Sequence, residues 1–159
     1  DILNGDAGLD KLRGNLGNDT LNGGSESDDL RGGGGEDILN GDGGNDYMLG
    51  GNHSDTLNGG AGNDVLTGGF GGGVLDGYLD TFIYDDTANG GGGFDRIRDF
   101  ENGIDVIDLQ SFSFTDFTTE VYALASDTAS GMRINFGSGD VLFVENFYLA
   151  SFDAGDVVI

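Results

Sequence analysis

Several residue types are missing or scarce in this 159-residue chain, which has no cysteine, proline or tryptophan. Without cysteine no disulfide framework can form, so a protein of this composition outside the cell needs another stabilising link. Only 6 Lys and Arg stand against 29 Asp and Glu, and the resulting net charge of −23 makes nucleic acids and anionic membranes poor partners. No apolar run approaches the about 18 residues that a membrane span needs, and the first residues lack the basic and apolar regions of a signal peptide.

Glycine is abundant instead, with 33 residues in the chain. High charge, many glycines and few aliphatic side chains are typical of disorder, because little apolar burial is available to offset the entropy of ordering the chain. Such a chain folds only if something else stabilises the folded state. The excess of acidic residues suggests that this is a cation.

A strict nine-residue repeat organises the first half of the chain. Aspartate recurs every nine residues from Asp1 to Asp64, with Leu or Met two residues after it and glycine five residues before it. Three residue classes in phase over eight units exclude chance. Glycines and aromatics are also segregated: 24 of the 33 glycines lie in residues 1–77, whereas 14 of the 16 Phe and Tyr lie in residues 78–159. The chain therefore has two unlike parts.

Each repeat reads as a tight turn followed by a short strand. Six residues of Gly, Asn and Asp adopt turn geometry at low cost, and the next three suit a strand that points one aliphatic side chain inward. Two units form one coil of 18 residues, with turns on alternating edges. The sequence thus predicts an all-β fold, a right-handed parallel β-roll (a β-helix or solenoid) with a thin aliphatic core and a C-terminal β-rich cap.

Stacked coils also bring carboxylates together. Aspartates 18 residues apart should lie one strand spacing, about 4.8 Å, from each other, where bare carboxylates repel. Carboxylates surrounded by turn carbonyls form a hard-oxygen site that suits Ca²⁺ better than Mg²⁺. Five Ca²⁺ would bring +10 against the net −11 of residues 1–77. The five pairs are Asp10/Asp28, Asp19/Asp37, Asp28/Asp46, Asp37/Asp55 and Asp46/Asp64.

The tandem pattern GGxGxDxUx resembles the calcium-binding repeat of the repeats-in-toxin (RTX) family, whose link to Ca²⁺ is general knowledge. The resemblance implies about five or more Ca²⁺. In each site one turn gives its Asp and the carbonyls two and four residues before it, and the next turn on that edge gives its Asp and the carbonyls three and five residues before it. The implied ligands are Asp6, Gly8, Asp10, Gly23, Ser25 and Asp28; Asn15, Gly17, Asp19, Gly32, Gly34 and Asp37; Gly24, Glu26, Asp28, Gly41, Gly43 and Asp46; Gly33, Gly35, Asp37, Gly50, Asn52 and Asp55; and Asp42, Gly44, Asp46, Gly59, Ala61 and Asp64.

Three features depart from this pattern. Glu26 and His53 replace a turn glycine, so we expect strained or shifted turns there. Gly73 stands where an aspartate is due, so a site between Asp55 and that position should be weak or absent. The segment at 80–84, Asp-Thr-Phe-Ile-Tyr, resembles the last half-coil of such rolls, with about seven residues inserted in its turn, and this places Asp80 opposite Asp64 as a further ligand pair.

The second half also resembles the family, in the flank that follows its rolls. Residues 95–100 and 102–109 carry the pattern DxIxDFxxGxDxIDL, and strands are expected at 119–124, 132–136 and 141–144. We therefore expect an RTX roll over residues 1–84 and a β cap over 85–159 that covers the last coil. Two interpretations stay open for the flank aspartates: they bind a further Ca²⁺, or they occupy exposed strand positions. These residues are Asp95, Asp99, Asp105 and Asp108.

The sequence gives no support for catalysis. It has no HExxH or G-x-S-x-G motif, and its lone histidine, His53, has no Ser or Cys partner that would complete a triad. The family resemblance implies a secreted, extracellular module that folds on binding Ca²⁺ and supports the export, folding and stability of a larger bacterial protein. The chain ends in Asp-Val-Val-Ile, which resembles the C-terminal signal of type I exporter substrates. The expected partners are calcium, an upstream domain of the parent protein and the exporter.

The alternative function is a carbohydrate-binding accessory module like those attached to alginate epimerases and lyases. A polyanionic sugar requires a basic groove, and only six cationic side chains are available for one. They are Lys11, Arg13, Arg31, Arg96, Arg98 and Arg133.

Overall fold

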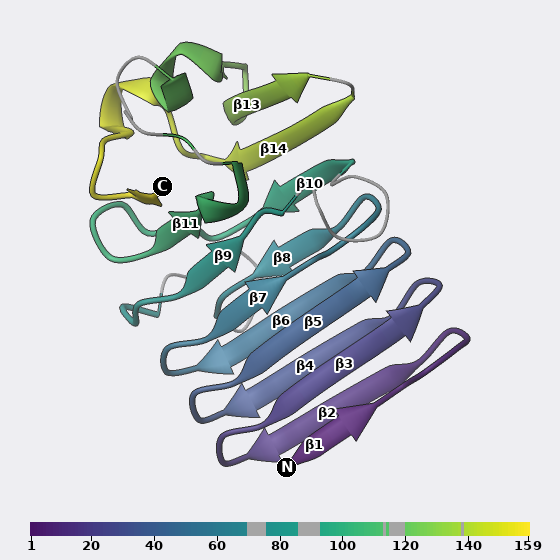
Figure 1. The fold of residues 1–159 in the computed structure, drawn as a ribbon. Helices are drawn as coiled ribbons and strands as arrows, with labels where there is room; N and C mark the ends of the chain where they lie inside the picture. The colour runs from purple at the N-terminus through teal and green to yellow at the C-terminus, as the bar shows by residue number, and fades with distance from the viewer. Residues whose placement is uncertain (70–75, 86–92, 113, 115–119, 138) are drawn as a thin grey trace.

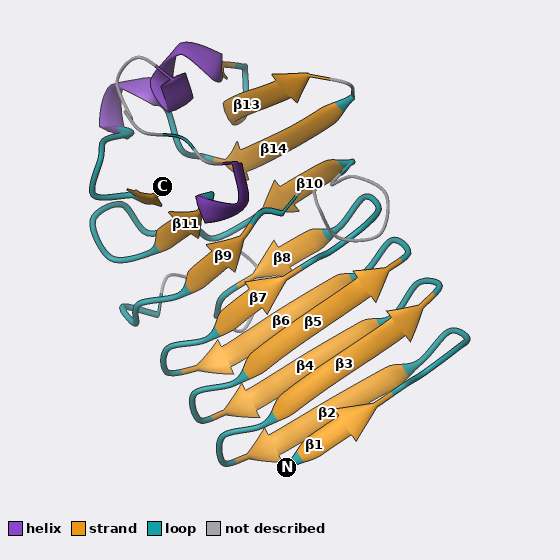
Figure 2. Cartoon of the chain, in the orientation of Figure 1, coloured by secondary structure: helices purple, strands orange, loops and turns teal. Residues whose placement is uncertain are grey.

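In the computed structural model the chain forms a parallel β-roll that ends in a small antiparallel cap (Figure 1). The structure describes residues 1–159 except 70–75, 86–92, 113, 115–119 and 138. Successive strands alternate between two facing sheets, so each turn of the chain moves from one sheet to the other. Figure 2 shows the coils stacked from the N-terminal end to the cap.

Odd-numbered strands of the roll form the first sheet, which we call sheet A, and even-numbered strands form the second, sheet B. The order in sheet A is β1-β3-β5-β7-β9-β11-β15 and in sheet B β12-β13-β14-β10-β8-β6-β4-β2. Strands of sheet A are β1 (Ile2–Asn4), β3 (Thr20–Ser25), β5 (Ile38–Gly43), β7 (Thr56–Asn58), β9 (Thr81–Ile83), β11 (Val106–Asp108) and β15 (Val157–Val158). Strands of sheet B are β2 (Lys11–Leu16), β4 (Asp29–Gly34), β6 (Tyr47–Asn52), β8 (Val65–Thr67), β10 (Phe94–Ile97), β12 (Ala125–Asp127), β13 (Gly131–Gly137) and β14 (Asp140–Glu145).

The register of the roll follows the sequence repeat. Parallel pairs join residues 18 apart, as in Leu21 with Leu39 and Leu30 with Met48. The second residue of each strand from β3 to β8 points between the sheets, where the aliphatic side chains form a single file that is at most 2% exposed: Leu21, Leu30, Leu39, Met48, Leu57 and Leu66. One aliphatic residue per half-coil makes a thin core, as the sequence predicted.

The parallel stack continues beyond residue 84, where the sequence predicted that the cap would begin. Strand β9 pairs with β11, and β8 pairs with β10, both in parallel. Among the strands of the described residues only β12, β13 and β14 pair antiparallel, while β14 also pairs in parallel with β10 and so joins the cap to the roll. The flank is thus the last part of the roll as well as the base of the cap.

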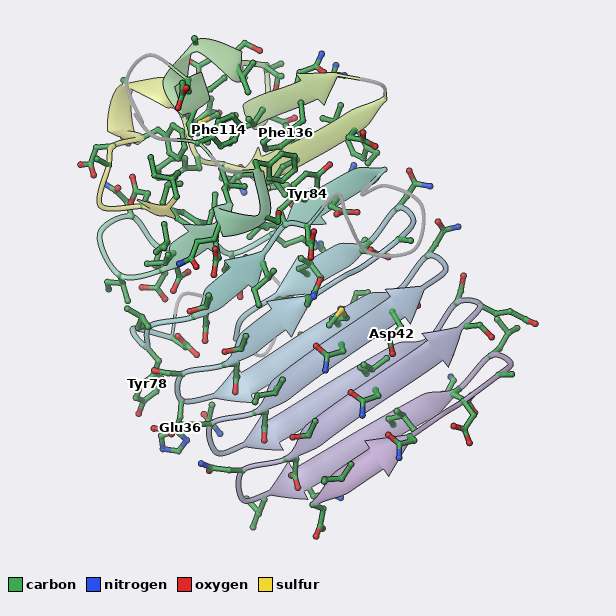
Figure 3. All side chains as sticks on the ribbon, viewed as in Figure 1. Glu36, Asp42, Tyr78, Tyr84, Phe114 and Phe136 are labelled. Carbon is green, nitrogen blue, oxygen red and sulfur yellow. The ribbon has the colours of Figure 1, made fainter. Side chains whose placement is uncertain are left out.

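Aromatic side chains join the aliphatic ones at this end of the core. Tyr84 stacks on Phe112 and Phe136 with ring centroids 5.8 and 4.7 Å apart, and Phe114 stacks on Phe112 at 5.6 Å. Figure 3 shows Tyr84, Phe114 and Phe136 gathered where the cap meets the roll. The larger rings fill the space between a coil and a cap that do not share the 18-residue register.

Two of the three strands expected in the cap are present, as β13 and β14. The strand expected at 119–124 is wrong: residue 119 lies outside the described residues, and 120–124 form helical turns that include the 3₁₀ helix η3 (Tyr122–Leu124). Val121 and Leu124, three residues apart, both pack on the core, which is helical spacing. The other 3₁₀ helices are η1 (Gln110–Phe112) and η4 (Leu149–Ser151).

Candidate metal sites

The repeat aspartates form two hydrogen-bonded ladders, one along each edge of the roll. The backbone N–H of Asp28 donates to Oδ1 of Asp46 at 2.8 Å, and that of Asp46 donates to Oδ1 of Asp64 at 2.8 Å. The opposite edge repeats the pattern from Asp19 to Asp37 and from Asp37 to Asp55. One oxygen of each carboxylate therefore holds the preceding coil in register.

The second oxygen of each carboxylate is buried without a hydrogen-bond partner. Seven repeat aspartates share this feature, and their Oδ2 atoms are those of Asp10, Asp19, Asp28, Asp37, Asp46, Asp55 and Asp64. Six of them lie on residues no more than 4% exposed, from Asp19 to Asp64. A buried charged oxygen without a donor is costly, so each of these atoms requires a positive partner.

A glycine five residues before each aspartate lets oxygens of two coils approach its Cα closely. A Cβ placed on Gly23 would lie 2.5 Å from Oδ2 of Asp28 and 2.8 Å from the carbonyl oxygen of Gly41. A carboxylate oxygen and a carbonyl oxygen of the next coil thus lie together beside one glycine, and we call this pair of oxygens a cradle. Equivalent cradles pair the aspartate and carbonyl of Asp10/Gly23, Asp19/Gly32, Asp37/Gly50 and Asp46/Gly59.

These five cradles bring together one carboxylate and one carbonyl from each of the five ligand sets implied by the sequence. The second aspartate of each set is placed differently, because Oδ1 of Asp28 accepts the N–H of Asp10 while its Oδ2 faces the next cradle. Other implied carbonyls accept backbone hydrogen bonds, and in the first set these are Asp6 O from Ser25 N at 2.9 Å and Ser25 O from Gly8 N at 3.2 Å. Each retains a second lone pair.

The turns achieve this geometry by left-handed residues two and four positions before each aspartate. Glycine occupies most of these positions, but Glu26 and His53 also adopt φ 77°. The expected strain is therefore present at Glu26 and His53. The expected shift is wrong, because the N–H of Asp28 and that of Asp37 keep their 2.8 Å bonds to the next coil. The ladder determines the path of the turn even without glycine.

The donor set of the cradles fits Ca²⁺. Within the described residues no three His, Cys, Asp or Glu side chains converge on one point, so most ligands must be backbone carbonyls. A set of carbonyl oxygens with few carboxylates on flexible turns is the coordination that Ca²⁺ accepts, whereas Mg²⁺ demands a tighter octahedral shell and Zn²⁺ prefers N or S ligands.

Burial raises the pKa values of these carboxyls in the calcium-free fold. It raises the pKa of Asp46 to about 7, of Asp55 to about 8 and of Asp64 to about 6. The backbone hydrogen bond of the ladder opposes each shift, and neighbouring carboxylates add to it at Asp46 and Asp55. Near pH 7 burial therefore favours the protonated form of these carboxyls, unless a bound cation stabilises the ionised form.

A sixth cradle extends the ladder past the repeat. The space beside Gly50 lies between Oδ2 of Asp55 and the carbonyl of Gly68. The expected partner position, Gly73, lies outside the described residues. The N–H of Asp55 donates to Oδ1 of Asp80 at 2.8 Å. The pairing of Asp80 with Asp64 is therefore wrong, because the seven-residue insertion adds to the 18-residue step and returns Asp80 to the edge of Asp55.

The flank aspartates close both ladders. The N–H of Asp64 donates to Asp95 at 2.9 Å, and that of Asp80 donates to Asp105 at 3.0 Å. Asp99 accepts from the N–H of both Gly68 and Gly69 at 2.9 Å. Asp95, Asp99 and Asp105 are buried, so the interpretation as exposed strand positions is wrong for them.

Asp108 behaves differently from the other flank aspartates, being half-buried with Oδ1 accepting the N–H of Gln110 at 2.9 Å. A role for any of the four in binding Ca²⁺ stays a prediction. The backbone N–H groups that donate to these carboxylates already explain why acidic residues occupy the four positions, whether or not a metal binds there.

A smaller ladder at the residue before each aspartate was not predicted from the sequence. The side-chain oxygens of Asn18, Ser27 and Asn45 accept the N–H of the residue 18 positions later, at 2.8 to 3.1 Å. Asn63 caps Phe94 in the same way at 3.0 Å. The signal was visible as a recurring Asn or Ser in the motif, since short polar side chains commonly cap turn N–H groups.

Comparison with protein families agrees with this geometry. Four copies of the RTX calcium-binding nonapeptide repeat match residues 1–30, 22–52, 49–77 and 80–100, which together span more than half of the chain. The chain belongs to this family. The fourth copy lies beyond the strict repeat and includes β9 and β10 of the RTX roll.

A solved structure with which the RTX chain shares 25% sequence identity is the solution structure of the AlgE6R3 subunit from the Azotobacter vinelandii mannuronan C5-epimerase. The match covers 91% of this chain and 79% of that chain, with a TM-score of 0.34. No curated protein matches the chain. None of the helices in the described residues has the length and apolar character of a membrane span.

Proposed function

We propose that this RTX chain is a non-catalytic module that folds when it binds calcium and so supports the export, folding and stability of a larger secreted bacterial protein. The observation that carries the proposal is the row of seven buried, unpartnered Asp Oδ2 atoms, six of which lie beside a carbonyl of the next coil. The thin aliphatic file alone offers little stabilisation against the entropy of ordering so many residues. Calcium supplies the missing free energy because it binds only the folded turns.

The ligands we assign to the five sites are those implied by the repeat, and the cradle of Asp55 and Gly68 makes a sixth. Extracellular Ca²⁺ is abundant and cytosolic Ca²⁺ scarce, so the chain stays unfolded before export and folds after it. Proteins with RTX repeats are typically secreted, and weak-binding extracellular calcium modules work in the range of about 10⁻⁴–10⁻³ M.

Far-UV circular dichroism with and without calcium tests this proposal. We expect a disordered spectrum in EDTA and a β spectrum on adding calcium, with a cooperative transition and a stoichiometry of five or six ions by equilibrium dialysis. Magnesium at equal concentration serves as the control and should leave the chain disordered. A full β spectrum in EDTA would contradict the proposal.

A second candidate function, binding of an acidic polysaccharide such as alginate, is supported by the placement of the cations. Strand alternation puts five of the six Lys and Arg on the outer face of sheet B, because each neighbours an inward core residue such as Leu12, Leu30 or Met132. The sixth, Arg98, follows β10 and approaches Glu145 on the same face. The outward positions of sheet A hold none of them. A single basic face on a chain of net charge −23 is suited to a polyanion.

Aromatic rings add to this face. Phe143 lies beside Arg96, whose guanidinium is 5.8 Å from the ring centroid, and it stacks with the partly exposed Phe94. Arg96 and Arg98 both approach Glu145, at 3.4 and 3.6 Å. A flat row of cations and rings could hold successive charged sugars along the roll.

Titration with alginate oligomers in saturating calcium tests this second function. We expect measurable binding that weakens with salt and is lost in Arg96→Gln/Arg98→Gln, while a matched change outside the basic face, Asn40→Gln on sheet A, leaves it intact. Absence of binding by the calcium-loaded wild-type chain would eliminate this function without affecting the calcium proposal.

A further inference from the structure

Four Asn-Gly steps stand at equivalent places on one edge of the roll. Asn4, Asn22, Asn40 and Asn58 pair with one another in sheet A, and each is followed directly by a glycine. The equivalent positions on sheet B hold Arg13, Arg31, Leu49 and Thr67 before their glycines. Asn-Gly is the dipeptide most prone to deamidation, so within the nine-residue repeats of residues 1–68 one edge carries this chemical weakness and the other does not.

The glycines of these steps belong to the cradles. Gly23, Gly41 and Gly59 each leave the space beside a repeat aspartate, and each is an assigned carbonyl ligand. Oδ2 of Asp28 and the carbonyl of Gly41 face the space beside Gly23, as Oδ2 of Asp46 and the carbonyl of Gly59 face the space beside Gly41. Damage to the asparagine therefore occurs next to a ligand of the edge that carries Asp10, Asp28, Asp46 and Asp64.

The folded roll restrains the reaction at these steps. The N–H of Gly5 donates to the carbonyl of Asn22 at 2.9 Å, which ties up the nitrogen that would attack. Nδ2 of Asn22 donates to Oδ1 of Asn4 at 2.7 Å and Nδ2 of Asn40 to Oδ1 of Asn22 at 2.8 Å. Extended strand geometry also holds the side-chain carbonyl carbon away from the next nitrogen. None of these restraints exists in an unfolded chain.

We propose that calcium binding protects this edge from deamidation, and that a chain kept without calcium loses its calcium sites on that edge by covalent damage. In the reaction the glycine nitrogen attacks Cγ of the asparagine, loses its proton and expels ammonia to form a succinimide. Water then opens the ring to aspartate or isoaspartate. No reactant other than water is required.

Both products harm the site. Aspartate adds a negative charge to a row of side chains one strand spacing apart. Isoaspartate lengthens the main chain by one methylene, which displaces the following glycine carbonyl and breaks the 18-residue register. The opposite edge, with Asp19, Asp37 and Asp55, stays chemically intact, although it shares the same core. The proposal rests on calcium-dependent folding, because without it calcium has nothing to protect.

Peptide mapping after incubation at pH 8 and 37 °C, with calcium or with EDTA, tests the proposal. We expect isoaspartate at Asn22 and Asn40 to form at least about tenfold more slowly with calcium, because folded amides react only through opening. A synthetic peptide that contains Asn22 and Gly23 provides the reference, because it has no fold to protect it, and it should react at the same rate with calcium and with EDTA. Equal rates at Asn22 and Asn40 in both conditions would overturn the proposal.

The functional consequence has its own test. Wild-type chains are aged in EDTA and returned to calcium, and their bound calcium ions are then counted. The variant Asn22→Ser/Asn40→Ser/Asn58→Ser is aged and measured in the same way. Wild-type chains should bind fewer ions with age, whereas the variant should keep its starting stoichiometry; unchanged binding by damaged wild type would overturn the proposal. If the variant does not fold, Asn→Gln at the same positions replaces it.

Dichroism of the fresh chain with and without calcium separates the two levels of failure. If the fresh chain does not fold on calcium, the proposed function fails and protection fails with it. If the fresh chain folds on calcium but the rates at Asn22 and Asn40 do not change, only the protection proposal fails.

Discussion

At the scale of single residues, each half-coil depends on an aspartate that has two separate tasks. Oδ1 fixes the preceding coil through a backbone N–H, and Oδ2 lies in the cradle beside a glycine. The glycine has to lack a side chain because a Cβ would collide with the two oxygens of the cradle. Asp and Gly therefore act as a unit, which explains why the two keep a fixed spacing of five residues.

Filling one cradle tests the role of the missing side chain. In Gly41→Ala the new Cβ would overlap Oδ2 of Asp46 and the carbonyl of Gly59, so we expect loss of at least one calcium ion and destabilisation of about 1–3 kcal/mol. Equilibrium dialysis and thermal unfolding in calcium measure the two effects. Gly43→Ala on the same strand is the control, since its Cβ would meet nothing closer than 3.8 Å. Equal behaviour of the two variants would argue against the cradle.

Removing one charge separates the ligand role of an aspartate from its hydrogen bond. Asp37→Asn can still accept the N–H of Asp19 through its amide oxygen but offers Ca²⁺ no carboxylate. We expect the half-saturating calcium concentration for folding to rise about tenfold, in the range that altered metal ligation commonly causes. Calcium titration by circular dichroism gives the value. Asp29→Asn, which loses only a surface pair with Arg31, should titrate like wild type.

At the scale of the secondary-structure elements, the half-coil is too small to be stable alone, and the last half-coils meet a special difficulty. Their N–H groups have no further repeat aspartate to bind. Acids of the flank take over this role: Asp95 accepts from Asp64, Asp105 from Asp80, and Asp99 from two glycines after β8. Unsatisfied N–H groups in the buried interior would otherwise cost free energy at the end of the stack.

The two hydrogen bonds that Asp99 accepts from the glycines after β8 provide a test at this scale. Asp99→Ala leaves the N–H groups of Gly68 and Gly69 without their acceptor, at about 1–3 kcal/mol for each buried group. We expect a lower melting temperature in saturating calcium, measured by differential scanning calorimetry. Asp108→Ala, which removes one bond at a half-buried position, should have a much smaller effect. A similar loss in both variants would show that Asp99 has no special role.

At the scale of the whole molecule, the net charge of −23 is distributed unevenly. Carboxylates line both edges of the roll, all six Lys and Arg lie on the outer face of sheet B, and sheet A carries a row of paired asparagines. Because like charges stack along each edge, the calcium-free roll is opposed by its own carboxylates at neutral pH. Besides calcium, protons can relieve this repulsion, because they neutralise the carboxylates.

The pKa shifts predict the direction of the pH effect on the calcium-free chain. Burial raises the pKa values of Asp46, Asp55 and Asp80 to about 7 or 8, well above their values in the unfolded chain. The fold then binds more protons than the unfolded chain, so its stability is greatest at low pH and falls as the pH rises from about 4 to 8. We expect β dichroism in EDTA to increase from pH 8 to pH 5, and a spectrum independent of pH would contradict this.

The sequence by itself determined the roll, its 18-residue register and its repeat aspartates, because the strict repeat combines turn formers with one inward aliphatic residue per unit. It did not determine how the roll ends. Asp80 joined the edge of Asp55, and the flank became further coils with acids that cap backbone N–H groups. Insertions break the period, so only tertiary pairing can assign these strands to a sheet. The single basic face was likewise decided by strand alternation across β2, β4, β10 and β13 and by the contact of Arg98 with Glu145, which bring together cations far apart in the sequence.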